Sequence, residues 1–306
     1  MPHISIVVPV FQAENSLYEL WQRLKSSIEP ITHDFEVLLI DDYSSDRSWE
    51  IILKLAQSDA RVKGLKFSRN FGQHYGITAG IDHCNGDWVV VMDCDLQDQP
   101  EEIPKLYQKA QQGFEIVLAR RINRQDSVIK KGFSWLFYKV FSYFLDLKYD
   151  GQVGNFRIIS KKVALTFRSM RENLRFFGGM ISWMGYPTAT VDVQHASHGK
   201  NKSTYTFKKL CKLAGDSIIA YSDKPLLLAI RLGLLMSVLA FCYGIYQLIH
   251  AFIYRSPVPG WTSLIISLYF IGGIIIGILG IIGIYLGKTF QETKKRPLYI
   301  IEELTN

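Results

Sequence analysis

The sequence predicts an α/β protein in which a mostly parallel sheet is followed by amphipathic helices at a membrane interface and by a transmembrane hairpin of two helices. Three observations lead to this fold class. Short runs of Val, Ile and Leu alternate with helix-period segments over the first 120 residues. Two long apolar runs without charge lie near the C-terminus, and Lys and Arg gather on either side of them.

Five short runs rich in Val, Ile and Leu are predicted to be strands that are buried on both faces. They span residues 3–11, 35–42, 62–67, 88–93 and 114–119, and helix-period segments lie between them at residues 16–27, 45–57, 75–84 and 100–112. Pro100 and two acidic residues begin the last of these helices, and Gly113 follows it. This alternation predicts a doubly wound, mostly parallel sheet that binds ligands at the carboxyl ends of its strands.

Residues 156–160 and 188–195 are predicted to be further strands, with an irregular, aromatic and Gly-rich connection at residues 175–185. Residues 132–147 are predicted to form an aromatic helix, for which two interpretations stay open: a core helix packed on the sheet, or a helix near a membrane surface. Residues 204–225 are amphipathic, with apolar side chains on one side and lysines on the other, and are predicted to lie at the membrane interface.

Two apolar runs are long enough to cross a bilayer. Residues 232–254 and 261–286 contain no Asp, Glu, Lys or Arg over 23 and 26 residues, whereas about 20 apolar residues suffice for about 30 Å of hydrocarbon. Only six residues separate the runs, so both ends of the hairpin should face one compartment. Basic residues gather at those ends, which predicts a multi-pass protein of the inner or plasma membrane with the sheet and both termini in the cytoplasm. The N-terminus lacks the basic region and cleavage site of a signal peptide.

The net charge of +7 is unevenly distributed, because Lys and Arg outnumber Asp and Glu by 12 to 4 between residues 157 and 224. Nucleic acid is one candidate partner for such a stretch. However, the stretch lies beside the hairpin, where anionic lipid attracts each basic side chain by about 1 kcal/mol. We therefore expect a lipid or lipid-phosphate partner and no nucleic acid. The four cysteines form no CxxC pair and are expected to be reduced thiols.

Acidic residues follow two of the predicted strands. Asp41 and Asp42 end the second strand, and Asp93, Asp95 and Asp98 follow the fourth. Because the carboxyl ends of parallel strands meet at one edge, we expect these residues to form one site, where like charges repel unless a positive group lies among them. The carboxylates of Asp93 and Asp95 suit Mg²⁺ or Mn²⁺, which prefer oxygen ligands and share their coordination shell with phosphates. The alternative is that the DxD pair only caps a helix.

Five segments occur in order along the chain: IVVPVFQAEN, LLIDDYSSD, FSRNFGQHYGITAGID, GDWVVVMDCDLQDQPEEIP and HGKNKSTY. Together they resemble family 2 glycosyltransferases of the GT-A fold. More narrowly, they resemble the polyprenyl-phosphate branch, which includes dolichol-phosphate mannose synthases and bacterial bactoprenol glucosyltransferases. The DLQDxPE form, the SRNFG element and the closing GIYLGKTFQETKKRPLYII support this branch, and the resemblance covers nearly the whole chain.

The resemblance implies roles for particular residues. Positions that hold a nucleotide's base and ribose match Pro9, Val10, Asp41 and Asp42. The metal-binding DxD motif matches Asp93 and Asp95, with Asp95 the expected direct ligand, and a position near the sugar matches Gln97. Basic positions expected to hold phosphate match Arg120, Arg121, Lys130 and Lys131. A loop expected to close over the acceptor phosphate matches Lys202, Ser203 and Tyr205.

The implied activity is a metal-dependent, inverting transfer of one hexose from a nucleotide sugar to a polyprenyl (undecaprenyl) phosphate at the cytoplasmic membrane face. UDP-glucose is the first expectation for the donor, GDP-mannose is the second, and a homo-oligomer is expected. The resemblance divides the chain into a catalytic domain at residues 1–203, interface helices at 204–225, transmembrane helices at 226–288 and a cytoplasmic tail at 289–306.

Three other classes fit less well. A processive polysaccharide synthase shares the sheet and the DxD motif, but it needs more membrane helices and usually a QxxRW motif, which this sequence lacks. A non-catalytic membrane-anchored binding module would retain the fold without needing the acidic set intact. A nucleotide-cofactor dehydrogenase is disfavoured because no GxGxxG follows the first predicted strand, and no Walker A sequence is present.

Overall fold

The computed structural model describes residues 4–121, 153–194, 222, 224–254 and 260–305. Two compact units make up the chain: one contains the sheet together with the C-terminal segment Arg296–Asn306, and the other contains two long helices. The predicted helix at residues 132–147 and almost all of the predicted interface segment at 204–225 lie outside the described residues.

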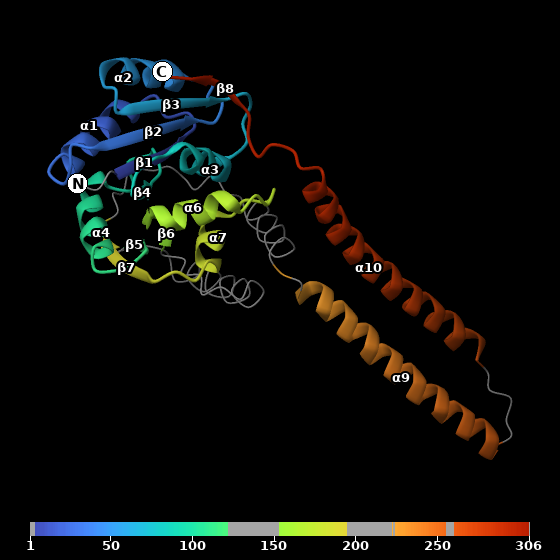
Figure 1. Ribbon diagram of the computed structural model, residues 1–306. Coiled ribbons are helices and arrows are strands. Elements are labelled where there is room, and N and C mark those ends of the chain that lie inside the picture. The colour runs from blue at the N-terminus through green and yellow to red at the C-terminus, as the bar shows by residue number, and fades with distance from the viewer. Residues whose placement is uncertain (1–3, 122–152, 195–221, 223, 255–259, 306) are drawn as a thin grey trace. The chain divides into compact units, whose positions relative to one another are not determined.

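The first unit is built on an eight-stranded sheet with the order β7-β5-β6-β4-β1-β2-β3-β8 (Figure 1). Strand β1 pairs in parallel with β2 and β4, β2 with β3, and β5 with β7. Strand β6 runs antiparallel between β4 and β5, and β8 runs antiparallel to β3. The strands are β1 (Ile4–Val10), β2 (Phe35–Asp41), β3 (Val62–Phe67), β4 (Trp88–Val91), β5 (Ile116–Arg121), β6 (Val153–Ser160), β7 (Thr188–Val193) and β8 (Ile301–Leu304). The prediction of a mostly parallel sheet is confirmed.

Helices cover both faces of the sheet, which explains why every residue of β1 and β2 is buried. One core cluster joins a sheet face to α1 (Leu17–Ile28), α2 (Ser48–Ser58) and α4 (Ile103–Ala110). The other joins the opposite face to α3 (Gln73–His83), α6 (Lys161–Ser169) and α7 (Phe177–Trp183). A short 3₁₀ turn, η1 (Pro100–Glu102), leads into α4. The four helices predicted between the strands are therefore present.

The connection predicted to be irregular at residues 175–185 instead contains helix α7. Its sequence, FGGMISW, has a poor intrinsic helix propensity because of its two glycines. Five consecutive residues from Phe177 to Ile181 are nevertheless buried, and the rings of Phe167 and Phe177 meet edge to face at 5.4 Å. Tertiary packing therefore overrides local propensity here.

The second unit contains α9 (Lys224–Tyr254) and α10 (Trp261–Thr293), of 31 and 33 residues. The segments Lys224–Tyr246 and Ser267–Thr293 are long and apolar enough to cross a membrane, as the sequence predicts. Apolar side chains such as Leu234, Phe241 and Ile276 are about 70% exposed, a pattern that suits lipid rather than water. The glycines of α10 have no described neighbour within 4 Å of an added Cβ.

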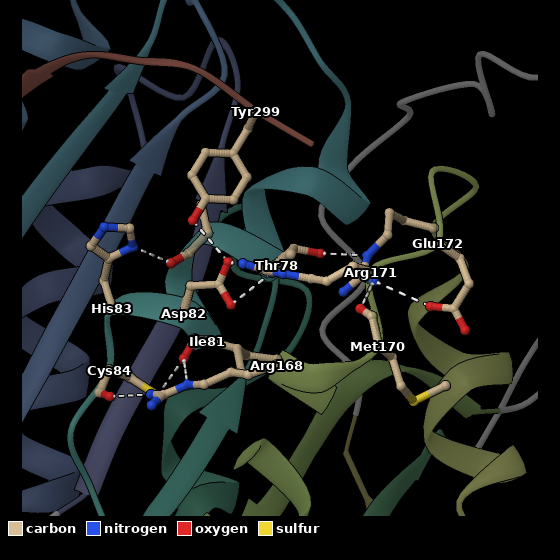
Figure 2. A network of polar contacts seen from close by, with 12 residues as sticks. Thr78, Ile81, Asp82, His83, Cys84, Arg168, Met170, Arg171, Glu172 and Tyr299 are labelled. Atoms are coloured by element: carbon tan, nitrogen blue, oxygen red, sulfur yellow. Dashed lines mark hydrogen bonds and ion pairs between the residues drawn. The ribbon is translucent and has the colours of Figure 1, made fainter. Parts of the chain in front are cut away.

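The segment after α10 returns to the first unit. Strand β8 pairs with the edge strand β3, and Glu303 accepts hydrogen bonds from Trp49 Nε1 at 3.0 Å and from Lys66 Nζ at 2.7 Å. Figure 2 shows Tyr299 and Arg171 meeting at Asp82 of α3: Tyr299 donates a hydrogen bond of 2.8 Å, and Arg171 Nη1 lies 2.8 Å from the same carboxylate oxygen. The C-terminal segment is thus part of the sheet and not a free tail.

Candidate functional site

A cleft of about 530 Å³ opens at the carboxyl ends of β1, β2 and β4. Its lining residues come from the end of β1, from the loops that follow β1, β2, β3 (Val62–Phe67) and β4, and from the start of α3, and they are Pro9, Val10, Phe11, Asp42, Asn70, Gly72, Gln73, Asp93, Cys94 and Asp95. The structure therefore brings together five of the residues that the sequence nominates: Pro9, Val10, Asp42, Asp93 and Asp95. Their meeting at one edge follows from the parallel pairing of these strands.

Asp42 lies in the cleft and is held by backbone donors. Its two carboxylate oxygens accept hydrogen bonds from Phe71 N at 2.6 Å and Gly72 N at 2.8 Å, while Asn70 Nδ2 donates to the Asp42 carbonyl at 3.2 Å. Gly72 has φ +104°, a conformation that favours glycine and lets the loop fold back onto Asp42. Each carboxylate oxygen keeps lone pairs for a further donor, such as a ligand hydroxyl.

Asp41 is fully buried and does not line the cleft. One of its oxygens accepts a hydrogen bond from Ser44 N at 3.3 Å, and burial raises the pKa of its carboxyl. The structure thus separates the acidic pair: Asp42 faces the cleft, and Asp41 supports the loop behind it.

Three further acidic residues gather where β4 ends. Asp93 accepts a hydrogen bond of 2.6 Å from Gln73 Nε2, Asp95 accepts one of 3.1 Å from Gln97 N, and buried Asp98 forms an ion pair of 3.1 Å with Arg121. Burial, together with the negative charges of Asp98 and Asp95, raises the pKa of Asp93 to about 7. The positive charge of Arg121 acts in the opposite direction. Arg121 is therefore a positive group among these carboxylates.

The residues at this edge fit a divalent cation. The described residues contain no cluster of three or more His, Cys, Asp or Glu side chains that could hold a metal on their own. Mg²⁺ is commonly bound by only one or two carboxylates together with substrate phosphates, so a pair of ligands suffices. Burial is the main cause of the raised pKa of Asp93, and the charges of Asp98 and Asp95 raise it further, so a cation held by Asp93 and Asp95 would relieve that repulsion. Gln97 follows in the same loop and is partly buried.

The two arginines of β5 do not share a role. Arg121 joins the acidic cluster, whereas Arg120 pairs with Asp192 of β7 at 2.6 Å in an exposed ion pair. Neighbouring residues of a strand face opposite sides of the sheet, so only one of the two can reach the cluster. Lys130, Lys131, Lys202, Ser203 and Tyr205 lie outside the described residues, and their roles stay predictions.

Sequence reasoning missed Asn70 and Gln73 as residues of the cleft. Both lie in the segment FSRNFGQHYGITAGID, which contributes to the family resemblance. Their position between a parallel strand and the following helix was a usable signal, because loops at that edge bind ligands. Gln73 begins α3 and donates to Asp93, so this helix reaches from the cleft to the contact with Tyr299 at its other end.

His74, the next residue of α3, provides a test of the electrostatics near the site. Burial, with the charges of Arg157 and Arg175, lowers its pKa to about 4 from an ordinary 6.5, and its ring meets Phe176 edge to face at 5.8 Å. The unfolded chain takes up this proton first, so stability should fall as the pH drops from 6.5 towards 4, by up to about 3 kcal/mol. His74→Phe keeps a ring and cannot be protonated.

We expect the melting temperature of the wild-type protein in detergent to fall more steeply over this pH range than that of His74→Phe. At pH 8, where His74 is neutral, the melting temperatures of the two proteins should differ little, apart from any change caused by repacking around Phe at this position. Parallel curves for the two proteins between pH 7 and pH 4 would show that His74 is not held neutral.

The carboxyl edge of the sheet and its acidic loops place this protein among α/β proteins of the GT-A fold. A crystal structure of mannosyl-3-phosphoglycerate synthase from Rubrobacter xylanophilus is similar in fold, with a TM-score of 0.53 at 13% identity over 72% of this chain and 73% of that chain. The family model for Glycosyl transferase family 2 matches residues 5–188. This chain therefore belongs to glycosyl transferase family 2.

Two curated relatives match almost the entire chain. An uncharacterized glycosyltransferase, YkcC of Bacillus subtilis (strain 168), is 38% identical over 98% of this chain and 93% of its own length. A prophage bactoprenol glucosyl transferase homolog of Escherichia coli (strain K12) is 36% identical over 98% of this chain and 99% of its own length. The similarity extends through α9 and α10 as well as the sheet.

Proposed function

We propose that this protein transfers one glucosyl residue from UDP-glucose to a polyprenyl phosphate such as undecaprenyl phosphate, with a divalent cation and with inversion at the anomeric carbon. The structural observation that supports it is the meeting of Asp42, Asp93 and Asp95 around one cleft. The names of relatives at about 36% identity over nearly the full chain support a bactoprenol-linked acceptor and a glucosyl group. GDP-mannose is the alternative donor.

Each part of the cleft suits a part of a nucleotide sugar. Pro9, Val10 and Phe11 offer an apolar wall to a base, and Asp42 offers a carboxylate to a ribose hydroxyl. Asp93 and Asp95 would hold a divalent cation, which when bound neutralises the charge that develops on the leaving diphosphate. Arg121 brings a permanent positive charge to the same place.

The transfer needs no strong general base. A phosphate monoester has a second pKa of about 6, so the acceptor is largely dianionic near neutral pH and is itself the nucleophile. Its oxygen attacks the anomeric carbon while the bond from that carbon to the nucleoside diphosphate breaks, and the electron pair leaves on the diphosphate. The protein then contributes chiefly by positioning both phosphates and by stabilising the leaving charge.

Chain topology supports a site held beside a membrane. Residues before α9 form strands β1 to β7, and β8 after α10 joins the same sheet, so the two ends of a spanning pair would have to emerge on one side. We infer that this side is the cytoplasm, since basic residues gather there in the sequence. An acceptor whose prenyl chain stays in the bilayer would then present its phosphate to the site at the headgroup plane.

The decisive assay uses the full chain in nanodiscs that contain undecaprenyl phosphate and a panel of radiolabelled nucleotide sugars. We expect label to enter the lipid fraction from UDP-glucose, to be released by mild acid, and to disappear when EDTA removes divalent cations. Long label-containing polymers would favour a processive synthase, and nucleotide binding without transfer from any donor would favour a non-catalytic module.

A further inference from the structure

Arg121 occupies a socket formed by two residues from distant parts of the sequence. Its Nη2 atom lies 3.1 Å from a carboxylate oxygen of Asp98, whose side chain is 1% exposed, while the Arg121 side chain is 30% exposed. On another side the guanidinium lies against the backbone of Gly154 in β6. Within the described residues, Asp98 is the one hydrogen-bond partner of this guanidinium. Since a guanidinium has five N–H donors, others can reach an oxyanion.

The position of Gly154 requires glycine because it leaves no room for a Cβ atom, and not because its backbone angles exclude other residues. Its φ lies outside the left-handed region, so other residues could adopt the conformation. A Cβ at this position, however, would lie 2.9 Å from Arg121 Nη2 and 3.2 Å from Cζ. The Gly154 backbone is itself fixed, because Arg157 Nη2 donates to its carbonyl at 2.6 Å. Any larger residue must therefore displace the guanidinium.

The strand register also directs Arg121 to this place. The β5–β6 pairing shifts between Leu118 and Arg120, and such irregularities commonly re-aim a side chain next to a functional site. After the shift, Arg121 lies beside Gly154 and Asp98, and its charge acts on Asp93.

We infer that Asp98 and Gly154 are positioning residues that hold Arg121 ready to bind a phosphate group beside Asp93. This inference rests on the proposed function and deepens it. Asp98 fixes the guanidinium through a buried, charge-assisted hydrogen bond, and Gly154 leaves the space that the guanidinium fills. Both the donor diphosphate and the acceptor phosphate present the oxyanion that this arrangement recognises.

Two substitutions test the socket without removing Arg121. Gly154→Ala displaces the end of a flexible side chain, so its melting temperature should stay within a few degrees of the wild type. Asp98→Asn keeps an acceptor and removes the charge. For each variant we expect a loss in kcat/KM of about tenfold, because a hydrogen bond to a charged group is lost or misplaced.

The neighbouring arginine supplies a matched control. Asp192→Asn breaks the exposed pair with Arg120, which lies on the same strand but outside the acidic cluster. Because exposed ion pairs contribute little, this variant should transfer sugar within about twofold of the wild-type rate.

A double-mutant cycle separates positioning from general damage. If Gly154 acts through Arg121, then Gly154→Ala should cause no further loss in an Arg121→Met background. The affinity of the wild type and Gly154→Ala for UDP with Mn²⁺, and for undecaprenyl phosphate in nanodiscs, identifies the phosphate: weaker UDP binding indicates the donor, and weaker lipid binding indicates the acceptor.

The inference is overturned if Gly154→Ala and Asp98→Asn keep wild-type kinetics and both affinities, or if the Gly154→Ala loss persists undiminished without Arg121. If the wild type transfers no sugar, the proposed function fails, but the two affinities still decide whether the socket positions Arg121.

Discussion

Asp95→Ala is expected to abolish sugar transfer, with a rate at least about a thousandfold below that of the wild type. Asp95 is exposed in the cleft beside Asp93, and together they are the carboxylates that would hold a divalent cation. Loss of that cation removes several kcal/mol of stabilisation from the charge developing on the diphosphate, which corresponds to a rate factor of about this size. The assay is lipid-extracted label from UDP-glucose at saturating Mg²⁺ or Mn²⁺.

The same substitution should leave the fold intact. The Asp95 side chain accepts a hydrogen bond from Gln97 N, and its charge raises the pKa of Asp93 by repulsion. Removing that charge relieves the repulsion, so the melting temperature should be unchanged or slightly higher.

A matched control lies at the other end of the same strand. Asp87, just before β4, forms an exposed ion pair of 3.3 Å with Lys161, and Asp87→Ala should keep both activity and stability. Full activity of Asp95→Ala at ordinary Mg²⁺ would contradict the metal assignment.

Most of the sheet could be predicted because strands buried on both faces leave an unmistakable apolar run in the sequence. Every residue of β1 and β2 is buried, and both stand where such runs were expected. Strand β8 leaves no such run: its sequence is IEEL, its last three residues are exposed, and it is a strand only because β3 offers a free edge. Pairing with an edge remote in sequence cannot be read from local composition.

For the candidate site, too, one part could be predicted from the sequence and another part could not. That Asp42, Asp93 and Asp95 share an edge follows from the parallel direction of their strands, which the sequence predicts. Which of Arg120 and Arg121 joins the acidic cluster does not follow from the sequence. Alternation along a strand places the two residues on opposite sides but does not say which one faces the cluster. The register shift in the β5–β6 ladder and the space at Gly154 decide it, and both depend on β6. The sequence offers no comparable signal for Gly154, since glycine is common in loops and turns.

Removal of residues 297–306 is expected to lower the melting temperature of the full chain by roughly 5–10 °C, which corresponds to about 2–3 kcal/mol for a domain of this size. The truncation removes β8 from the edge of β3 and takes Tyr299 off Phe67, a fully buried ring on which it stacks at 5.4 Å. The unpaired edge and the uncovered ring should also promote aggregation. Activity should fall too, because the lost contact with Asp82 loosens the helix whose first residue, Gln73, supports Asp93.

Point substitutions within this segment show whether the loss on truncation comes from the lost contacts or from shortening the chain. Tyr299→Ala should reproduce much of the loss, whereas Tyr299→Phe keeps the stacked ring and loses only the hydrogen bond to Asp82, at a cost of about 1 kcal/mol. Ile300, the next residue, is 53% exposed, so Ile300→Ala should change the melting temperature by no more than a degree or two.

A truncated protein as stable and active as the wild type would show that β8 does not hold the sheet together. If Ile300→Ala were as damaging as Tyr299→Ala, the docking of Tyr299 would not be the cause. Because the chain reaches this segment only after both apolar helices, these contacts make the stability of the sheet depend on residues beyond α10.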